Sequence, residues 1–321
     1  MAGILIFAET DEGLLHPHFW EQASAARQLA PQLGSVRVVA QGWEIKAEEA
    51  RRSGADEVYV VEDERLAEPW PDAHLAAFTA LCRELQPALI VMPRTILGLE
   101  MAARLAYRLG GGLAQDAMTL QVADGSLMVT RPVFGGAASA TLRLTRSPWI
   151  VVPRPGAFAT AEPTAEPAGK VISVRPELPD DELKTKCVSR ARQKSEKVSL
   201  ERAQVIISGG RGLDGPEPFK LLQQIADVIG AAVGASRPPC DSGWVPTSYQ
   251  IGLTGKMVSP EVYIAVGISG ATQHMTGCSS ARTIVAINND RDAPIFHMAT
   301  YGVVGDWKEV LPAFHAALAD K

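Results

Sequence analysis

Residues 203–230, AQVIISGGRGLDGPEPFKLLQQIADVIG, run from an apolar stretch through a glycine-rich turn into a helix-like pattern. The apolar run that ends at Ser208 favours a buried strand, and the spacing of the apolar residues after Pro218 is typical of an amphipathic helix. A strand, a tight turn and a helix in this order indicate an α/β unit. Gly210, Gly212 and Gly215 have the spacing G-x-G-x-x-G, so the turn is a candidate dinucleotide-binding turn.

The rest of the C-terminal part continues the same alternation. After the helix come strand-like runs at 231–236, 261–267 and 283–289, then the short run APIFH at 293–297. A long loop at 242–258 and a short helix after residue 270 lie between these runs. We therefore predict an α/β domain over residues 203–321.

The N-terminal part predicts a second α/β domain, over residues 1–159. Its strand-like runs alternate with helical patterns at 22–30, 74–85 and 98–112, which implies a parallel sheet covered on both faces. From Met118 onward the pattern changes to paired strands, with Asp124-Gly125 at a hairpin turn. We expect these to be an antiparallel extension of the first sheet. The expected strands of this domain are 4–9, 36–41, 58–63, 88–93, 118–134 (a hairpin), 140–145 and 149–155.

Residues 160–202 predict a connector between the two domains. They begin with a stretch rich in Pro, Ala, Thr and Glu and continue with the charged run ELKTKCVSRARQKSEK. Such composition without periodicity is typical of an inter-domain linker. The fold class is thus α/β with two domains.

Composition excludes several classes of protein. A net charge of −5 over 321 residues argues against a general nucleic-acid-binding surface. No apolar run approaches the roughly 20 residues that span a bilayer, and the N-terminus resembles neither a signal nor a transit peptide. We expect a bacterial cytoplasmic protein, with a processed mitochondrial chain as the alternative. The thiols of Cys82, Cys187, Cys240 and Cys278 are too scattered for a disulfide framework or zinc site, and His16 and His18 fit loop residues better than metal ligands.

The glycine motif alone is weak support for a Rossmann site. That fold needs an Asp or Glu about 20 residues further on to bind the ribose, and here the next strand ends in Ser236-Arg237 followed by two prolines. Pro216 and Pro218 also remove amide hydrogens from the helix start.

The carboxyl ends of the other strands form a more consistent pattern, because ligands of open α/β sheets gather there. Polar groups follow these strands at 208–211, 236–237, 269–274 and 288–290. Caps and turns explain one such cluster. Four in one domain, two with arginine, favour an anionic nucleotide-like ligand.

The C-terminal blocks closely resemble the alpha subunit of electron-transfer flavoproteins. The resemblance rests on SGGRGL (208–213), VGASRPPCDSGWVP (233–246), YQIGLTGK (249–256), YIAVGISGATQHMTG (263–277) and TIVAINNDRDAPIF (283–296), in this order. It is dense from about Ala203 to Phe314, looser over the N-terminal domain and nearly absent in the connector. The resemblance implies that the C-terminal domain binds one FAD and that the G-x-G-x-x-G spacing is incidental.

The resemblance also implies which residues face the cofactor. Arg237, Thr254 and His274 would tune the flavin: Arg237 lies against the ring, Thr254 reaches N5, and His274 donates a hydrogen bond or a positive charge near the C2 oxygen. Ser236 and the backbone at Ser269 suit the pyrophosphate. The full set of implied FAD-binding residues is Arg211, Ser236, Arg237, Gln250, Ile251, Gly252, Leu253, Thr254, Ser269, Gly270, Ala271, Thr272, Gln273, His274, Asn288, Thr300 and Tyr301.

Three positions depart from the family pattern. Leu253 stands where many relatives carry Gln, which removes a polar contact near the ring. Thr300 stands where Asp is common, leaving Tyr301 as the nearest ring at that edge, and Cys278-Ser-Ser replaces a more usual polar turn.

The function implied is that of an electron carrier rather than an enzyme with its own substrate. FAD would accept electrons from a flavin dehydrogenase and pass them to a quinone oxidoreductase or another acceptor. The chain would form a heterodimer with a beta subunit that holds AMP or a second FAD. The alternatives are an NAD-dependent enzyme and an adenine-nucleotide-binding regulatory module on a related scaffold.

Overall fold

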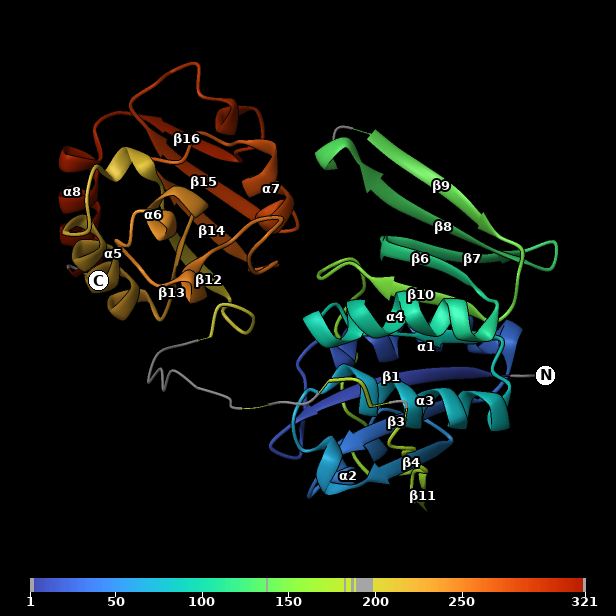
Figure 1. The fold of residues 1–321 in the computed structure, drawn as a ribbon. Helices are drawn as coiled ribbons and strands as arrows, with labels where there is room; N and C mark the ends of the chain where they lie inside the picture. Colours follow the sequence, from blue (N-terminus) through green and yellow to red (C-terminus); the bar gives the residue numbers. More distant parts are fainter. Residues whose placement is uncertain (1–2, 137, 182, 186–187, 189–198, 320–321) are drawn as a thin grey trace. The chain divides into compact units, whose positions relative to one another are not determined.

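The computed structural model describes residues 3–136, 138–181, 183–185, 188 and 199–319 (Figure 1). The chain divides into two compact units: Met1–Val133 with Ala137–Ala191, and Phe134–Gly136 with Arg192–Lys321. Cys187 and the part of the predicted connector at 182, 186–187 and 189–198 lie outside the described residues.

The main sheet of the first unit is parallel along the order β11-β4-β3-β1-β5-β10-β6, and the short β2 pairs with β1 in the antiparallel sense. The four strands predicted from apolar runs at 4–9, 36–41, 58–63 and 88–93 are present as β1, β3, β4 and β5. The strands of this sheet are β1 (Ile4–Asp11), β2 (Leu14–Leu15), β3 (Val36–Gly42), β4 (Glu57–Glu62), β5 (Leu89–Val91), β6 (Gly112–Ala117), β10 (Trp149–Pro153) and β11 (Lys170–Val174).

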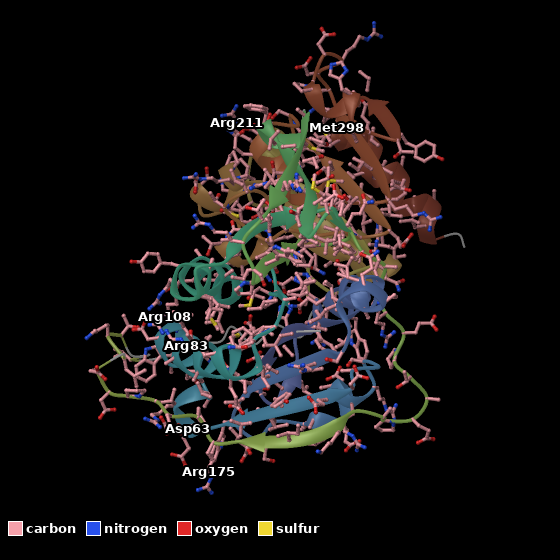
Figure 2. All side chains as sticks on the ribbon, turned by 90° about the vertical axis from the view of Figure 1, so that its right-hand side faces the viewer. Asp63, Arg83, Arg108, Arg175, Arg211 and Met298 are labelled. Atoms are coloured by element: carbon pink, nitrogen blue, oxygen red, sulfur yellow. The ribbon has the colours of Figure 1, made fainter. Side chains whose placement is uncertain are left out.

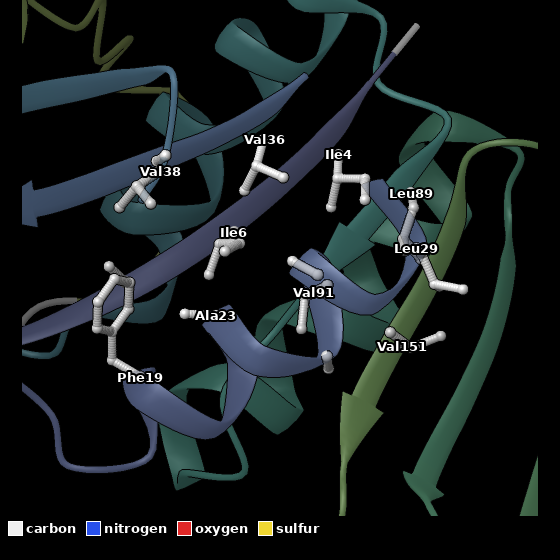
Figure 3. Close-up of a cluster of buried hydrophobic side chains, with 14 of the residues drawn as sticks. Ile4, Ile6, Phe19, Ala23, Leu29, Val36, Val38, Leu89, Val91 and Val151 are labelled. Atoms are coloured by element: carbon white, nitrogen blue, oxygen red, sulfur yellow. The ribbon is translucent and has the colours of Figure 1, made fainter. Parts of the chain in front are cut away.

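Helices cover both faces of this sheet because the buried strands are apolar on both sides. Ile4 and Ile6 of β1 pack against Phe19 and Ala23 of α1 (Figure 3), whereas Leu5 and Phe7 belong to the core beneath α3 and α4. Both predicted faces are therefore filled. The helices of the first unit are α1 (Phe19–Leu33), α2 (Ala47–Arg51), α3 (Pro71–Leu85) and α4 (Ile96–Leu109), with a single 3-10 turn at η1 (Glu64–Leu66). A further 3-10 turn, η2 (Phe134–Gly136), is grouped with the second unit.

The antiparallel strands are present, but they form a three-stranded sheet of their own rather than extending the parallel sheet. They are β7 (Thr119–Ala123), β8 (Ser126–Val133) and β9 (Ala138–Leu144). Leu120 of β7 and Leu127 and Val129 of β8 join the core that also contains α1, whereas β9 has no buried position. The run at 149–153, expected to continue them, is instead β10, buried at every position between β5 and β6. A continuous apolar run fits the middle of a parallel sheet better than a half-exposed edge.

The predicted connector contributes to the first unit. Residues Lys170–Val174 form β11, which pairs in parallel with β4, and Leu178 is buried in the core beneath α3. The backbone amide and hydroxyl of Thr185 both donate to Asp72 Oδ2, at 2.8 and 2.9 Å, and Arg104 Nη2 donates to Asp72 Oδ1 at 2.5 Å. Asp72, with its side chain 4% exposed, therefore holds this part of the chain against α3 and α4.

The second unit has a five-stranded parallel sheet in the order β13-β12-β14-β15-β16. Helices α5 and α8 pack on one face, and α7 with the loop before β14 packs on the other. The run APIFH is a 3-10 turn, and the fifth strand starts later, at Tyr301. The elements are β12 (Val205–Gly209), η3 (Arg211–Leu213), α5 (Pro218–Ile229), β13 (Ala232–Ala235), α6 (Arg237–Asp241), η4 (Thr247–Tyr249), β14 (Val262–Val266), α7 (Thr272–Cys278), β15 (Thr283–Asn288), η5 (Pro294–His297), β16 (Tyr301–Val304) and α8 (Trp307–Ala319).

Candidate functional site

A cavity of about 640 Å³ opens at the carboxyl edge of the second sheet. The turns that follow β12, β13, β14 and β15 line it, as expected for a ligand site in an open parallel sheet. The loop at 250–254 adds a further wall: Gln250 forms a parallel bridge with Ala235, so this loop lies beside β13.

The cavity brings together most of the residues predicted from sequence. All of them line it except Gly270, Thr272, Thr300 and Tyr301. The lining residues outside the predicted FAD-binding set are Gly212, Pro238, Asp241, Gly267, Ile268, Asp290 and Ala293. They adjoin predicted residues in the chain, so the position of the strand ends was the signal that pointed to them.

Thr300 and Tyr301 lie elsewhere. They stand at the amino end of β16, where Tyr301 is level with Val285 and 65% exposed. The Thr300 hydroxyl accepts a hydrogen bond from the Ile284 amide at 3.2 Å, so it supports the pairing of β15 with β16. The geometry does not support a ligand contact for this pair, because β16 begins at Tyr301 rather than ending before it.

The carboxyl end of β16 instead contributes Asp306, which the sequence analysis missed. With Asn289, Trp307 and others, Asp306 lines a smaller hollow of about 190 Å³. This hollow shares Gly212, Gly267 and Asn288 with the larger cavity. One continuous carboxyl edge therefore presents a large and a small recess, and correct placement of the last strand would have identified Asp306.

The glycines of the first turn bring two backbone segments together. The amide of Gly210 donates to Val266 O at 2.8 Å, and that of Gly212 donates to Gly267 O at 3.0 Å. Gly267 has φ +61°, and a Cβ there would lie 2.9 Å from the carbonyl carbon of Gly212. By contrast, a Cβ on Gly215 would meet nothing within 4 Å. Gly210 and Gly212 thus allow the β12 and β14 turns to meet, and the third glycine of the motif takes no part in this contact.

Charges of both signs line the cavity. Arg237 Nε lies 3.0 Å from Asp241 Oδ2, one turn along α6, and both side chains are more than half exposed. Arg211 also lines the cavity and is exposed (Figure 2). Asp290 adds a second negative charge to the lining. The two arginines are therefore offset by two aspartates, and Asp241 competes with any anionic ligand for Arg237.

Several donors remain available to a ligand. Thr254 Oγ1 accepts a hydrogen bond from Gln250 Nε2 at 2.9 Å, which leaves its own hydroxyl proton to donate. Among the described residues no group accepts a hydrogen bond from the backbone amides of Ser269–Ala271. Asn288, in contrast, uses its side chain to brace the site, donating to Ile268 O at 3.0 Å and accepting from the Asp290 amide at 2.9 Å.

His274 is held by protein groups on both ring nitrogens. Nδ1 lies 3.0 Å from Ile251 O, and Nε2 lies 2.9 Å from the hydroxyl of Tyr263. Burial lowers the pKa of His274 to about 4, so the ring is neutral near pH 7. The sequence predicted a cation or hydrogen-bond donor at this position. In this geometry His274 supplies neither to the cavity, because desolvation opposes the charge and both nitrogens are occupied.

Two family models match most of the chain. Residues 4–179 match the electron transfer flavoprotein domain, and residues 199–279 match the electron transfer flavoprotein FAD-binding domain. The chain is similar to the "Electron transfer flavoprotein subunit alpha" of Thermoanaerobacterium thermosaccharolyticum, with 40% identity over 96% of this chain and 95% of that protein. The chain belongs to the electron transfer flavoprotein alpha-subunit family. This confirms the family, the α/β fold class, FAD as cofactor and the electron-transfer function predicted from sequence.

Other relatives of this family span nearly the same length. The "Electron transfer flavoprotein subunit alpha" of Bacillus subtilis is 35% identical over 96% of this chain and 95% of its own. "Protein FixB" of Azorhizobium caulinodans is 39% identical over 98% of this chain and 88% of its own.

Membrane-spanning helices and metal-ligand clusters are two features that the described part of the chain lacks. No helix in it combines the length and apolar character needed to cross a membrane. It contains no group of three or more His, Cys, Asp or Glu side chains placed to hold a metal ion, and the rings of His16 and His18 pack edge to face at 4.9 Å. Cys82, Cys240 and Cys278 are buried and form no disulfide.

Proposed function

We propose that the cavity at the carboxyl edge of the second sheet holds the FAD of this electron transfer flavoprotein alpha subunit. The observation that carries the proposal is the convergence of the family's FAD-pocket positions on that cavity. Its volume of about 640 Å³ lies within the usual range for cofactor-sized ligands. When bound, FAD supplies the electron-accepting and electron-donating ring.

The residues present fit this cofactor. The amides of Ser269–Ala271 are free to receive a phosphate oxygen, and Gly252 has φ +145°, where a Cβ would lie 2.9 Å from Gln273 O. Gly252 therefore allows the loop at 250–254 to lie close against the start of α7 in the cavity wall. Thr254 offers a hydroxyl proton, and Arg237 and Arg211 offer positive charge. The smaller recess, with Asp306 and the shared Asn288, is the place we assign to the adenosine end, instead of Thr300 and Tyr301.

The partner of the chain is a beta subunit, and the pair acts as a heterodimer. The relatives are named as alpha subunits, which supports a second kind of subunit. We propose that the beta subunit holds AMP or a second FAD, that electrons come from a flavin dehydrogenase, and that they leave to a quinone oxidoreductase or another acceptor. The chain has in this proposal no substrate-turnover site of its own.

The domain division 1–159, 160–202 and 203–321 is kept as part of the proposal, with residues 170–181 and 183–185 acting as an extension of the first unit. We also assign the heterodimer to the bacterial cytoplasm, since the relatives described above are bacterial proteins. Fractionation of the source cells with an antibody to this chain tests the location, and recovery in the membrane or a secreted fraction would contradict it.

A visible absorption spectrum tests the function. The chain is co-expressed with a beta subunit from the same organism, purified, and examined for flavin bands and for FAD released on denaturation. We expect a yellow protein that is reduced by a flavin dehydrogenase without air and reoxidised by a quinone oxidoreductase. A colourless complex that takes up no FAD, but binds NAD or AMP to this chain in a calorimeter, would establish one of the rival functions instead.

A further inference from the structure

A tyrosine outside the predicted site contacts the most deeply buried titratable group of the cavity wall. Tyr263 lies on β14, is 0% exposed, and its hydroxyl is 2.9 Å from Nε2 of His274 on α7. Tyr263 does not line the cavity, whereas His274 does. Any effect of Tyr263 on a ligand must therefore act through His274.

The second nitrogen of His274 determines the direction of this hydrogen bond. The carbonyl oxygen of Ile251 can only accept, so Nδ1, at 3.0 Å, carries the proton. In a neutral ring Nε2 is then an acceptor, and the Tyr263 hydroxyl donates to it. A second proton on Nε2 would face the hydroxyl that now donates to it.

The surroundings reinforce this arrangement. Ser208 of β12 and Cys278 of α7 are the other groups beside the phenol, and Cys278 Sγ also donates to His274 O at 3.7 Å. Burial raises the pKa of Tyr263 above its usual range, so the phenol keeps its proton. Neither neighbour offers a fixed negative charge that would favour a cationic ring.

We propose that Tyr263 is a positioning residue that fixes His274 as the neutral Nδ1–H tautomer. The claim rests on the proposed FAD site, because only there does the charge of His274 bear on electron transfer. With the ring fixed as neutral, the positive charge offered to the flavin comes from the arginines of the cavity, and it does not change with pH in the physiological range.

The test is nitrogen NMR of the histidine rings in the purified heterodimer, wild type and Y263F. In the wild type we expect His274 to show a protonated Nδ1 and no titration between about pH 5 and 9. In Y263F the neutral form loses one hydrogen bond, so the pKa of His274 should rise by about one unit, and both tautomers should appear. The potential of the first flavin reduction should then become more positive toward low pH in Y263F alone.

Two internal controls are available. His74 is buried in the other unit, and burial lowers its pKa to about 4, so its signals should not move in Y263F. Y59F removes a phenol that donates to Glu57 at 2.9 Å in the first unit and should leave His274 unchanged.

A wild-type His274 protonated on Nε2 would overturn the proposal even if Y263F failed to fold, and so would a Y263F protein with unaltered tautomer and pKa. Loss of the proposed function gives a different result, namely a colourless heterodimer whose His274 still shows the Nδ1–H signal.

Discussion

Substitution of Gly267 by Ala tests whether the contact between the β12 and β14 turns shapes the FAD site. Gly267 has φ +61°, a conformation that costs an L-residue roughly 1–2 kcal/mol. An added Cβ would lie 2.9 and 3.1 Å from the carbonyl carbon and Cα of Gly212, and 3.1 Å from the amide nitrogen of Leu213. These are backbone atoms that cannot turn aside, and overpacking of this kind costs about 1–3 kcal/mol. Together the second unit should lose about 2–5 kcal/mol of unfolding free energy.

The second unit contains a matched control in Gly230, at the end of α5. Gly230 has φ +66°, but a Cβ there would meet nothing within 4 Å. G230A therefore carries only the conformational cost, about 1–2 kcal/mol. The difference between the two variants isolates the close approach of the turns.

The two variants should differ in cofactor binding as well as in stability. Gly267 lines both recesses, whereas Gly230 lines neither. If the turns move apart to admit the methyl group, FAD should bind G267A at least about tenfold more weakly, a difference of about 1.4 kcal/mol. G230A should bind FAD like the wild type.

Stability is measured by hydrogen exchange in increasing urea, followed on peptides of β12 and β14, and affinity by titration of FAD into the flavin-free heterodimer. If G267A unfolds at the same urea concentration as G230A and binds FAD equally well, the turn contact does not shape the site and the reasoning fails.

Three further predictions concern charged groups. Asp72→Asn should destabilise the first unit by about 1–3 kcal/mol, because hydrogen bonds from Thr185 and Arg104 hold the pKa of Asp72 below its usual range against the opposing effect of burial. Urea unfolding at pH 7 measures this loss of stability, and an unchanged urea midpoint in the variant would contradict the prediction. The stabilisation by Asp72 should vanish as the pH falls through its lowered pKa. Burial raises the pKa of Glu21 to about 7 against the hydrogen bond from Gly156, so the folded protein binds an extra proton between about pH 4.5 and 7. The first unit should therefore lose stability as pH rises through that window. In Glu21→Gln the temperature of thermal unfolding should depend less on pH than in the wild type. If the two proteins show the same pH dependence, the raised pKa of Glu21 is refuted. Arg237→Ala should lower the potential of the first flavin reduction and Asp241→Asn should raise it, since one removes a positive and the other a negative charge beside the cavity; spectroelectrochemical titration decides, and shifts of the same sign would show that the pair does not act by charge.

The sequence was sufficient wherever a single pattern determined the structure. Apolar runs such as 4–9 and 205–208 became central strands, and the Asp124-Gly125 turn joined β7 to β8. The edge strand β11 was missed because none of its residues is buried and it follows a proline-rich stretch; only its backbone pairing with β4 makes it a strand. The last strand was misplaced for the opposite reason: Phe296 and its neighbours look like a strand, yet they form a 3-10 turn that delays β16 to Tyr301.

The candidate site was likewise predictable where it depends on local sequence pattern and not where it depends on contacts between distant residues. Strand ends can be located along a sequence, so the residues that directly follow β12 to β15 were predicted. Thr300 and Tyr301 came from the family resemblance, and Asp306, which follows β16, was missed because the last strand was misplaced. Hydrogen-bond partners cannot be located in this way. The pairing of His274 with Tyr263 joins a helix to a strand 11 residues earlier, and that of Arg237 with Asp241 requires a helical turn where two prolines obscure one.

These two pairings change how the site works, although they leave its location unaltered. From the sequence alone, a histidine near a flavin is expected to supply a positive charge that depends on pH. His274, whose two ring nitrogens are hydrogen-bonded to Ile251 and Tyr263, is instead a neutral part of the cavity wall. An arginine read alone implies full positive charge, whereas Arg237 shares its charge with Asp241. The cavity should consequently stabilise negative charge on the flavin only moderately, and the partner subunit becomes the natural place to look for further positive charge. If the isolated alpha subunit binds FAD and reaches the same first reduction potential as the heterodimer, its own residues suffice and this balance of charges has been misjudged.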